Sequence, residues 1–178
     1  MNNLEYSSKD PCEIFKATRV LNYYPTYVKI SHSCRLPQTY MNLIPIFLNQ
    51  NLPKPCLILS NCSLEIMLKA IYIKEKGSSF PPHTLSSEIL FDLTRNESGI
   101  DFDSISLIQS VNYVANYLNH TLLQNMSAAQ LQRIIRRVDD LLYRLSPRVA
   151  NSPTDRYSSI FKKEGYEWKH IQITDFEF

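Results

Sequence analysis

Apolar residues recur every three or four positions along most of this chain, which is the spacing of an amphipathic helix. The pattern predicts helices over about 10–24, 37–49, 55–76, 84–94, 101–122 and 128–145. Pro45 lies inside the second of these helices and should kink it, and Pro147 is expected just beyond the end of the last one. Beyond this last helix the helical spacing of apolar residues is lost. A short alternation of apolar and polar residues over 171–174 favours a strand.

Residues with specific terminal roles support several of these boundaries. Gly77 is placed to stop the helix over 55–76, because glycine readily adopts the left-handed conformation found at helix ends. Asp101 or Asp103 can cap the next long helix. Ser127 and Gln130 have the spacing of a capping box, so the last helix should begin directly after Ser127.

The helix expected over 55–76 is apolar around most of its circumference, which is typical of a helix at the centre of a bundle. Glu65 and Lys69 interrupt its apolar run, so a core helix explains the segment better than a membrane span. The sequence therefore predicts an all-α fold. We expect an antiparallel up-and-down bundle of five to six helices, followed by an irregular aromatic C-terminal tail.

The length of 178 residues fits a single domain over 1–178. We expect its core over about 36–146, an N-terminal helical extension over 1–35 and a C-terminal tail over 147–178. The tail is rich in aromatic residues and should pack on the bundle or on a partner.

Composition excludes several classes of function. The net charge of +2 is too small to indicate nucleic-acid binding by bulk electrostatics, and the three glycines form no phosphate-binding loop. None of the four cysteines has zinc-site spacing, so we expect reduced thiols, no metal site and no cofactor. The first residues have neither the basic nor the apolar region of a secretory signal, so a cytoplasmic protein without a membrane segment is expected.

One segment carries a more specific pattern. Residues 62–71, Cys-Ser-Leu-Glu-Ile-Met-Leu-Lys-Ala-Ile, are followed by Gly77, by the Pro81–Pro82 pair and then by His83-Thr84-Leu85. This order resembles the second helix and the following loop of HEPN proteins, over about 61–93. The resemblance implies an antiparallel helical bundle and a homodimer.

The chain departs from the ribonucleases of that family, which carry an Arg-x(4–6)-His motif. No histidine has an arginine at that distance upstream, among His32, His83, His120 and His170. Residues 156–159, Arg-Tyr-Ser-Ser, match only the first half of an Arg-Tyr-Pro-Asp motif of some members. The resemblance therefore favours a non-catalytic binding or regulatory module for a nucleotide, RNA or a partner protein. The alternatives are a divergent metal-independent ribonuclease or toxin of a toxin–antitoxin pair, using His83 or His120, and an accessory subunit of a nucleotidyltransferase-like partner.

Glu65, Lys69 and His83 form one candidate binding patch. Glu65 and Lys69 are one helical turn apart and project to the same side, and the proline loop should place His83 near them. The alternative, which we favour, is an intrahelical ion pair, with His83 hydrogen-bonded to the backbone as a cap of the next helix.

A second candidate is an anionic-partner surface on the last helix. Its basic side chains are Arg133, Arg136, Arg137, Arg144 and, at the helix end, Arg148. Such a surface would bind RNA or a nucleotide phosphate. The neighbouring Asp139 and Asp140 favour instead a solvated helix face with salt bridges at i,i+4 spacing.

Overall fold

A computed structural model describes residues 34–78, 80–94, 101–117, 123 and 125–161 of the chain. Within them lie five α-helices and one 3-10 turn, with no strand among the described residues, so the predicted all-α class is confirmed. The elements are α2 (Arg35–Asn49), α3 (Pro53–Lys76), α4 (Ser87–Thr94), α5 (Phe102–Tyr117), α7 (Ala128–Val149) and η2 (Pro153–Asp155). The helix predicted over 10–24 and the strand predicted over 171–174 lie outside the described residues.

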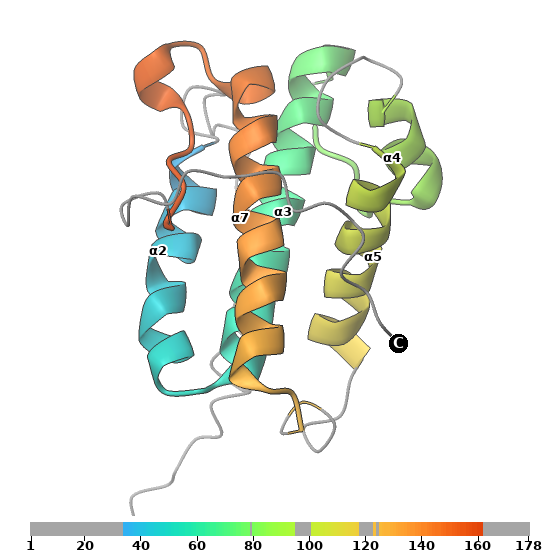
Figure 1. Cartoon of the computed structure of the whole chain (residues 1–178). Helices are drawn as coiled ribbons and strands as arrows, with labels where there is room; N and C mark the ends of the chain where they lie inside the picture. The colour runs from blue at the N-terminus through green and yellow to red at the C-terminus, as the bar shows by residue number, and fades with distance from the viewer. Residues whose placement is uncertain (1–33, 79, 95–100, 118–122, 124, 162–178) are drawn as a thin grey trace, which may run out of the picture.

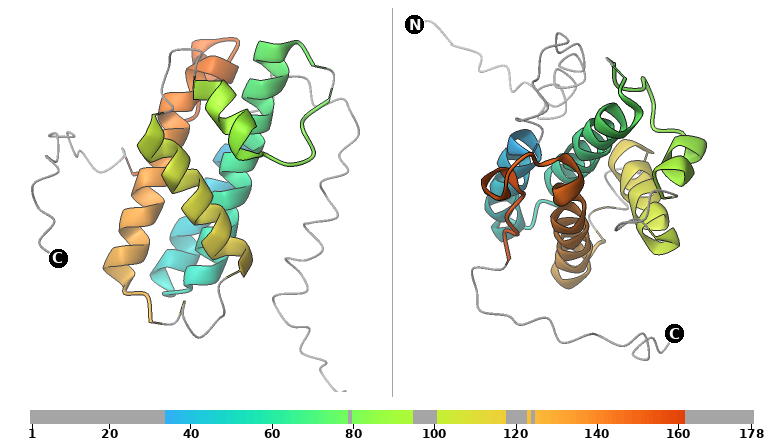
Figure 2. Two further views of the ribbon diagram at one scale, coloured as in Figure 1. Left: turned by 90° about the vertical axis from the view of Figure 1, so that its right-hand side faces the viewer. Right: turned by 90° about the horizontal axis from the view of Figure 1, so that it is seen from above.

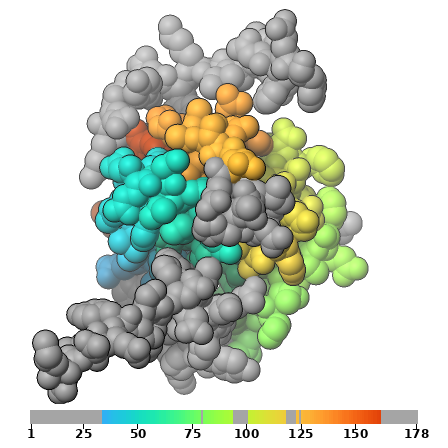
Figure 3. Space-filling view, turned by 90° about the horizontal axis from the view of Figure 1, so that it is seen from below, coloured from blue at the N-terminus to red at the C-terminus, as the bar shows by residue number. Residues whose placement is uncertain are grey.

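The four long helices are arranged side by side, with α3 at the centre. The chain descends through α2, rises through α3, descends through α5 and rises through α7 in Figure 1. Helix α3 packs against α2, α5 and α7, whereas α4 lies beside α5 at the edge of the bundle (Figure 2). From below, α2 lies on one side of α7 and α5 on the other (Figure 3).

Helix α3 is the central element of the core. Its fully buried side chains include Cys56, Leu57, Leu64, Met67, Leu68 and Ile71. The helix is long and apolar enough to cross a membrane, but most of its apolar window is buried by the rest of the protein. This burial agrees with the predicted role as a core helix of a bundle.

The helix ends follow the predicted signals closely. Gly77 ends α3 in the left-handed conformation, with φ at +61°. Asp101, and not Asp103, caps α5, because its Oδ1 accepts the backbone N–H of Ser104 at 2.8 Å. Ser127 and Gln130 form the predicted capping box at the start of α7.

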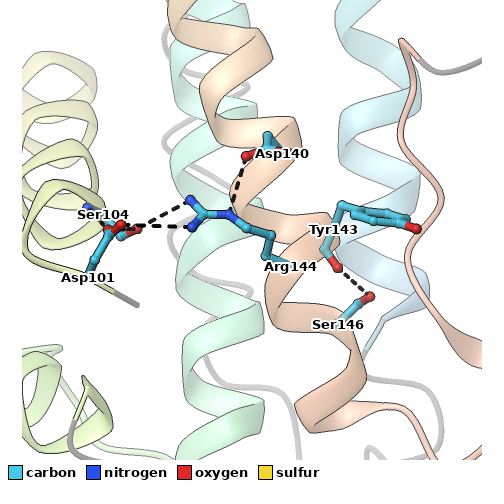
Figure 4. A network of polar contacts seen from close by, with 6 residues as sticks. All are labelled: Asp101, Ser104, Asp140, Tyr143, Arg144 and Ser146. Carbon is cyan, nitrogen blue, oxygen red and sulfur yellow. Dashed lines mark hydrogen bonds and ion pairs between the residues drawn. The ribbon is translucent and has the colours of Figure 1, made fainter. Parts of the chain in front are cut away.

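The prediction that α7 ends before Pro147 is wrong, because the helix continues to Val149 with the proline inside it. Proline lacks the N–H that would bond to the carbonyl of Tyr143, four residues earlier. The hydroxyl of Ser146 donates to that carbonyl oxygen at 3.0 Å and replaces the missing bond (Figure 4). The segment assigned to the C-terminal tail therefore begins inside the last turn of α7.

Candidate functional site

The first candidate patch contains the ion pair that its sequence spacing predicts. Lys69 Nζ donates to Glu65 Oε1 at 2.6 Å, with both residues on α3. The Lys69 side chain is 17% exposed and that of Glu65 is 30% exposed, so the pair lies at the boundary of the core. The prediction of an intrahelical ion pair is confirmed.

The third member of this patch is not joined to the other two. His83 is exposed in the loop between α3 and α4. Within the described part of the chain, no hydrogen bond or ion pair connects it to Glu65 or Lys69. The prediction that His83 caps the next helix is wrong, because the hydroxyl of Ser86 accepts the backbone N–H of Ile89 at 3.3 Å there. A patch of all three residues therefore stays a prediction.

The second candidate, the arginine surface of α7, is partly used for internal contacts. Arg144 Nε lies 3.2 Å from Asp140 Oδ2 on the same helix. Its other nitrogens reach across to α5, where Nη2 is 3.4 Å from Ser104 Oγ and Nη1 is 4.0 Å from Asp101 Oδ2 (Figure 4). Arg144 therefore links α7 to the first turn of α5.

Arg148 has a structural role that its place in the sequence did not reveal. Its side chain is only 6% exposed, and Nε and Nη2 bond to the two carboxylate oxygens of Glu75 at 2.7 and 2.8 Å. Nη2 also donates to the carbonyl of Leu93 at 3.0 Å. This bidentate contact joins the ends of α3, α4 and α7.

The remaining arginines divide into two groups. The guanidinium of Arg136 lies over the ring of Phe161, 4.6 Å from its centroid, as a cation–π contact. Arg133 and Arg137 are exposed, and no ion pair holds either of them among the described residues. Within the described residues, the predicted anionic-partner surface thus keeps two exposed side chains without an ion pair, one helical turn apart, since the exposed Arg144 is paired with Asp140.

A small polar cleft of about 170 Å³ lies between α5 and α7. It is lined by Asp101, Asp103, Ser104, Leu107, Arg137, Asp140 and Arg144. Hydrogen bonds from Ser104, and more weakly the charge of Arg144, hold the pKa of Asp101 below its usual range, so Asp101 is ionised at neutral pH. Three carboxylates then outnumber two guanidinium groups, which disfavours a phosphate ligand in this cleft.

A buried carboxylate on α7 is the structural feature that the sequence analysis missed. Asp139 and Tyr157 are each 1% exposed. Asp139 Oδ1 accepts the Tyr157 hydroxyl at 2.6 Å and the Ile160 backbone N–H at 3.0 Å, and Oδ2 accepts the Ser159 hydroxyl. Burial and the neighbouring carboxylate raise the pKa of Tyr157, so its hydroxyl stays protonated and donates.

The sequence did contain a signal for this burial. Asp139 follows Ile135 by four positions and precedes Leu142 by three, so it lies on the apolar face of α7 and not on its solvated face. A charged residue on that face needs buried donors. Its donors come from residues 18 to 21 positions further along the chain, beyond the range of a helical pattern.

The segment 152–161, here called the strap, returns from the end of α7 to α2. Besides its bonds to Asp139, it exchanges two hydrogen bonds with α2. The Ser158 N–H donates to Gln38 Oε1 at 2.7 Å, and Gln38 Nε2 donates to the Ser158 carbonyl at 3.0 Å. The Arg-Tyr-Ser-Ser sequence at 156–159 therefore has a structural role in tying α2 to α7.

The described cysteines are free thiols, as predicted. Cys34 and Cys56 are buried and Cys62 is half-buried, whereas Cys12 lies outside the described residues. Burial raises the pKa of Cys56 and Cys62 to about 11, so both thiols are protonated at neutral pH. In the part of the chain that the structure describes, no three His, Cys, Asp or Glu side chains are grouped to hold a metal ion.

No protein-family model matches this chain, and no curated protein or solved structure matches it significantly.

Proposed function

We propose that this chain is a non-catalytic, HEPN-like helical module that acts by binding a partner protein and works as a homodimer. The observation that carries the proposal is the outer face of α5, which exposes Phe102, Tyr113 and Tyr117. Solvent-exposed aromatic side chains that gather on one uncharged helix face are typical of protein–protein interfaces. The HEPN resemblance adds the expectation of a dimer.

The pairing of the charged side chains favours a binding role over a catalytic one. Glu65 pairs with Lys69, Glu75 with Arg148 and Asp140 with Arg144, while buried Asp139 accepts three donors from the strap. The first three form ion pairs, and the Glu75–Arg148 pair and the contacts of Asp139 hold separate segments of the bundle together. A general acid or base instead needs a free proton-transfer position beside a substrate.

The segment that resembles HEPN proteins, 61–93, covers the last two thirds of α3, the loop after Gly77 and nearly all of α4. Its resemblance therefore falls on one helix–loop–helix unit. Ligand classes suggested by the resemblance, nucleotide and RNA, receive less support than a protein partner. Arg133 and Arg137 are exposed on α7 without an ion pair among the described residues, the exposed Arg144 is paired with Asp140, and the adjoining cleft has an excess of carboxylates.

A nuclease assay tests the non-catalytic part of this proposal. Purified full-length protein, incubated with single-stranded and hairpin RNA, should give no cleavage above that of a buffer blank. Cleavage that survives purification and is abolished by His83→Ala or His120→Ala would replace the proposal with the divergent-ribonuclease alternative. His120 lies outside the described residues, so His120→Ala tests a residue whose place in the fold is not described.

The accessory-subunit alternative has a separate test. A nucleotidyltransferase-like protein encoded beside this chain should be co-purified with it if the two work together. The proposed module can bind such a partner, so this experiment identifies the partner and leaves the non-catalytic assignment intact. Nucleotidyl transfer by the isolated chain would contradict that assignment.

A further inference from the structure

Helix α5 has a line of exposed aromatic side chains on its outer face. Phe102 is 73% exposed, Tyr113 is 60% exposed and Tyr117 is 72% exposed. Spacings of 11 and 15 residues bring the three side chains to the same side of a helix with 3.6 residues per turn. The rings of Tyr113 and Tyr117 already stack, with centroids 5.7 Å apart. We call these three residues the aromatic stripe.

The aromatic stripe lies opposite the buried face of α5, which packs Ile105, Ile108 and Val111 into the core. Seen from outside, no described helix covers the outer face of α5 (Figure 2, left). Helix α4 only borders it, through the Gln109 side-chain amide, which donates to the Ser87 hydroxyl at 3.0 Å. The stripe spans about 22 Å along the helix axis.

The outer face of α5 also lacks the charges of an ordinary solvent-exposed helix. Asp103 is the single charged residue among the sixteen of α5. The positions between the aromatic rings are Ser106 and Gln109, both uncharged. Depletion of charge together with exposed tyrosine and phenylalanine is the composition found at the centre of protein interfaces. Because the face is neutral, a second copy of it would meet no electrostatic repulsion.

The positions on this face are spaced evenly about its middle, which lies between Gln109 and Ser110. In an antiparallel pair of α5 helices centred there, Phe102 of one helix lies opposite Tyr117 of the other, and Ser106 lies opposite Tyr113. Two copies of α5 packed antiparallel about a two-fold axis would therefore place aromatic against aromatic at both ends. Each Tyr113 would meet the small Ser106 of the other copy, which gives the large ring space.

We propose that a second copy of this chain docks on the aromatic stripe, with the two α5 helices antiparallel and their two-fold axis near Gln109. This inference rests on the homodimer of the proposed function and specifies its surface. The three rings expose together roughly 300–500 Å² per protomer, about half of what one side of a standard interface buries. The neighbouring uncharged residues supply the rest, and dissociation in the micromolar range is expected.

Sedimentation of charge-insertion variants tests the surface. Tyr113→Glu/Tyr117→Glu places four carboxylates in the proposed contact and should weaken dimerisation at least about 100-fold. Phe80→Glu is the matched control, because Phe80 is 65% exposed but lies in the loop between α3 and α4. It should dimerise like wild type. A dimer that persists in the double variant would overturn the α5 surface only, whereas a monomeric wild type would overturn the homodimer as well.

Cysteine cross-linking tests the register independently. Ser106 and Tyr113 are seven residues apart, about 10 Å along the axis, so the Ser106→Cys protein alone and the Tyr113→Cys protein alone should not form a disulfide across the two-fold axis. A mixture of the two proteins brings the new thiols opposite each other and should give a cross-linked dimer on a non-reducing gel. Wild type, with its native thiols, is the blank. Equal cross-linking in all samples, or none in the mixture, would contradict the antiparallel register.

Discussion

The buried contact between Tyr157 and Asp139 allows the sharpest test of how the strap is held. Tyr157→Phe removes a hydroxyl and leaves the ring in place. The Tyr157 hydroxyl donates to Asp139 Oδ1 at 2.6 Å, and both side chains are 1% exposed, so water does not replace the lost donor. The Ser159 hydroxyl and the Ile160 N–H still bond to Asp139, so its carboxylate does not become unpaired.

The size of the effect follows from the charge of the acceptor. A hydrogen bond to a charged group contributes about 1.5–3 kcal/mol to the free energy of unfolding, more than one between neutral groups. For a chain of this length, about 2 kcal/mol lowers the melting temperature by roughly 4–8 °C. The strap should also loosen locally, because Tyr157 and Ser159 are its side-chain links to α7 through Asp139.

Urea unfolding at neutral pH, followed by circular dichroism, measures the change in free energy. Tyr72→Phe is the matched control, because the same hydroxyl is removed from a half-buried side chain whose hydroxyl makes no hydrogen bond among the described residues, and its effect should stay within about 0.5 kcal/mol. Trypsin should cleave the Tyr157→Phe protein after Arg156 faster than it cleaves wild type. A Tyr157→Phe midpoint equal to that of Tyr72→Phe, with unchanged cleavage, would refute the assigned role of the contact.

Three further predictions concern the other contacts. Lys69→Met should change the free energy of unfolding by roughly 0–1 kcal/mol, because its pair with Glu65 keeps partial solvent contact; a larger loss in urea titration would show that the pair is fully desolvated. Arg148→Met should cost about 3–5 kcal/mol, because it leaves a carboxylate without its buried partner; a loss below about 1 kcal/mol would contradict the clamp. Cys56 and Cys62 should make the fold less stable as pH rises from 9 to about 11, because their pKa values are raised in the folded state and only the unfolded chain ionises in that window. Replacing both cysteines by alanine should reduce this loss of stability at alkaline pH. An unchanged dependence of the free energy of unfolding on pH would show that the two thiols do not cause it.

Most of the helix positions could be predicted because their signals are local. The capping box at Ser127 and the left-handed stop at Gly77 depend on residues within one or two turns. The wrong end predicted for α7 at Pro147 also depends on a local contact. The side chain of Ser146 supplies the hydrogen bond that makes the proline tolerable inside α7. A rule based on proline alone does not include that compensation.

Whether a contact in the candidate sites could be predicted depends on how far apart its residues lie in the sequence. The Glu65–Lys69 pair was predictable, because residues four positions apart on a helix are neighbours. The contacts of Arg148 with Glu75 and of Asp139 with Tyr157 join residues 73 and 18 positions apart. They depend on how α3, α7 and the strap pack, which periodicity does not specify. The apolar face around Asp139 indicated burial, but it could not name the donors.

Sedimentation equilibrium of the full-length wild-type protein, from low to high micromolar concentration, decides whether the chain is a homodimeric binding module. We expect a reversible equilibrium between monomer and dimer, with the dimer dominant at the upper end of the range. A single monomeric species at every concentration would contradict the homodimer and leave the aromatic stripe of α5 without its proposed partner.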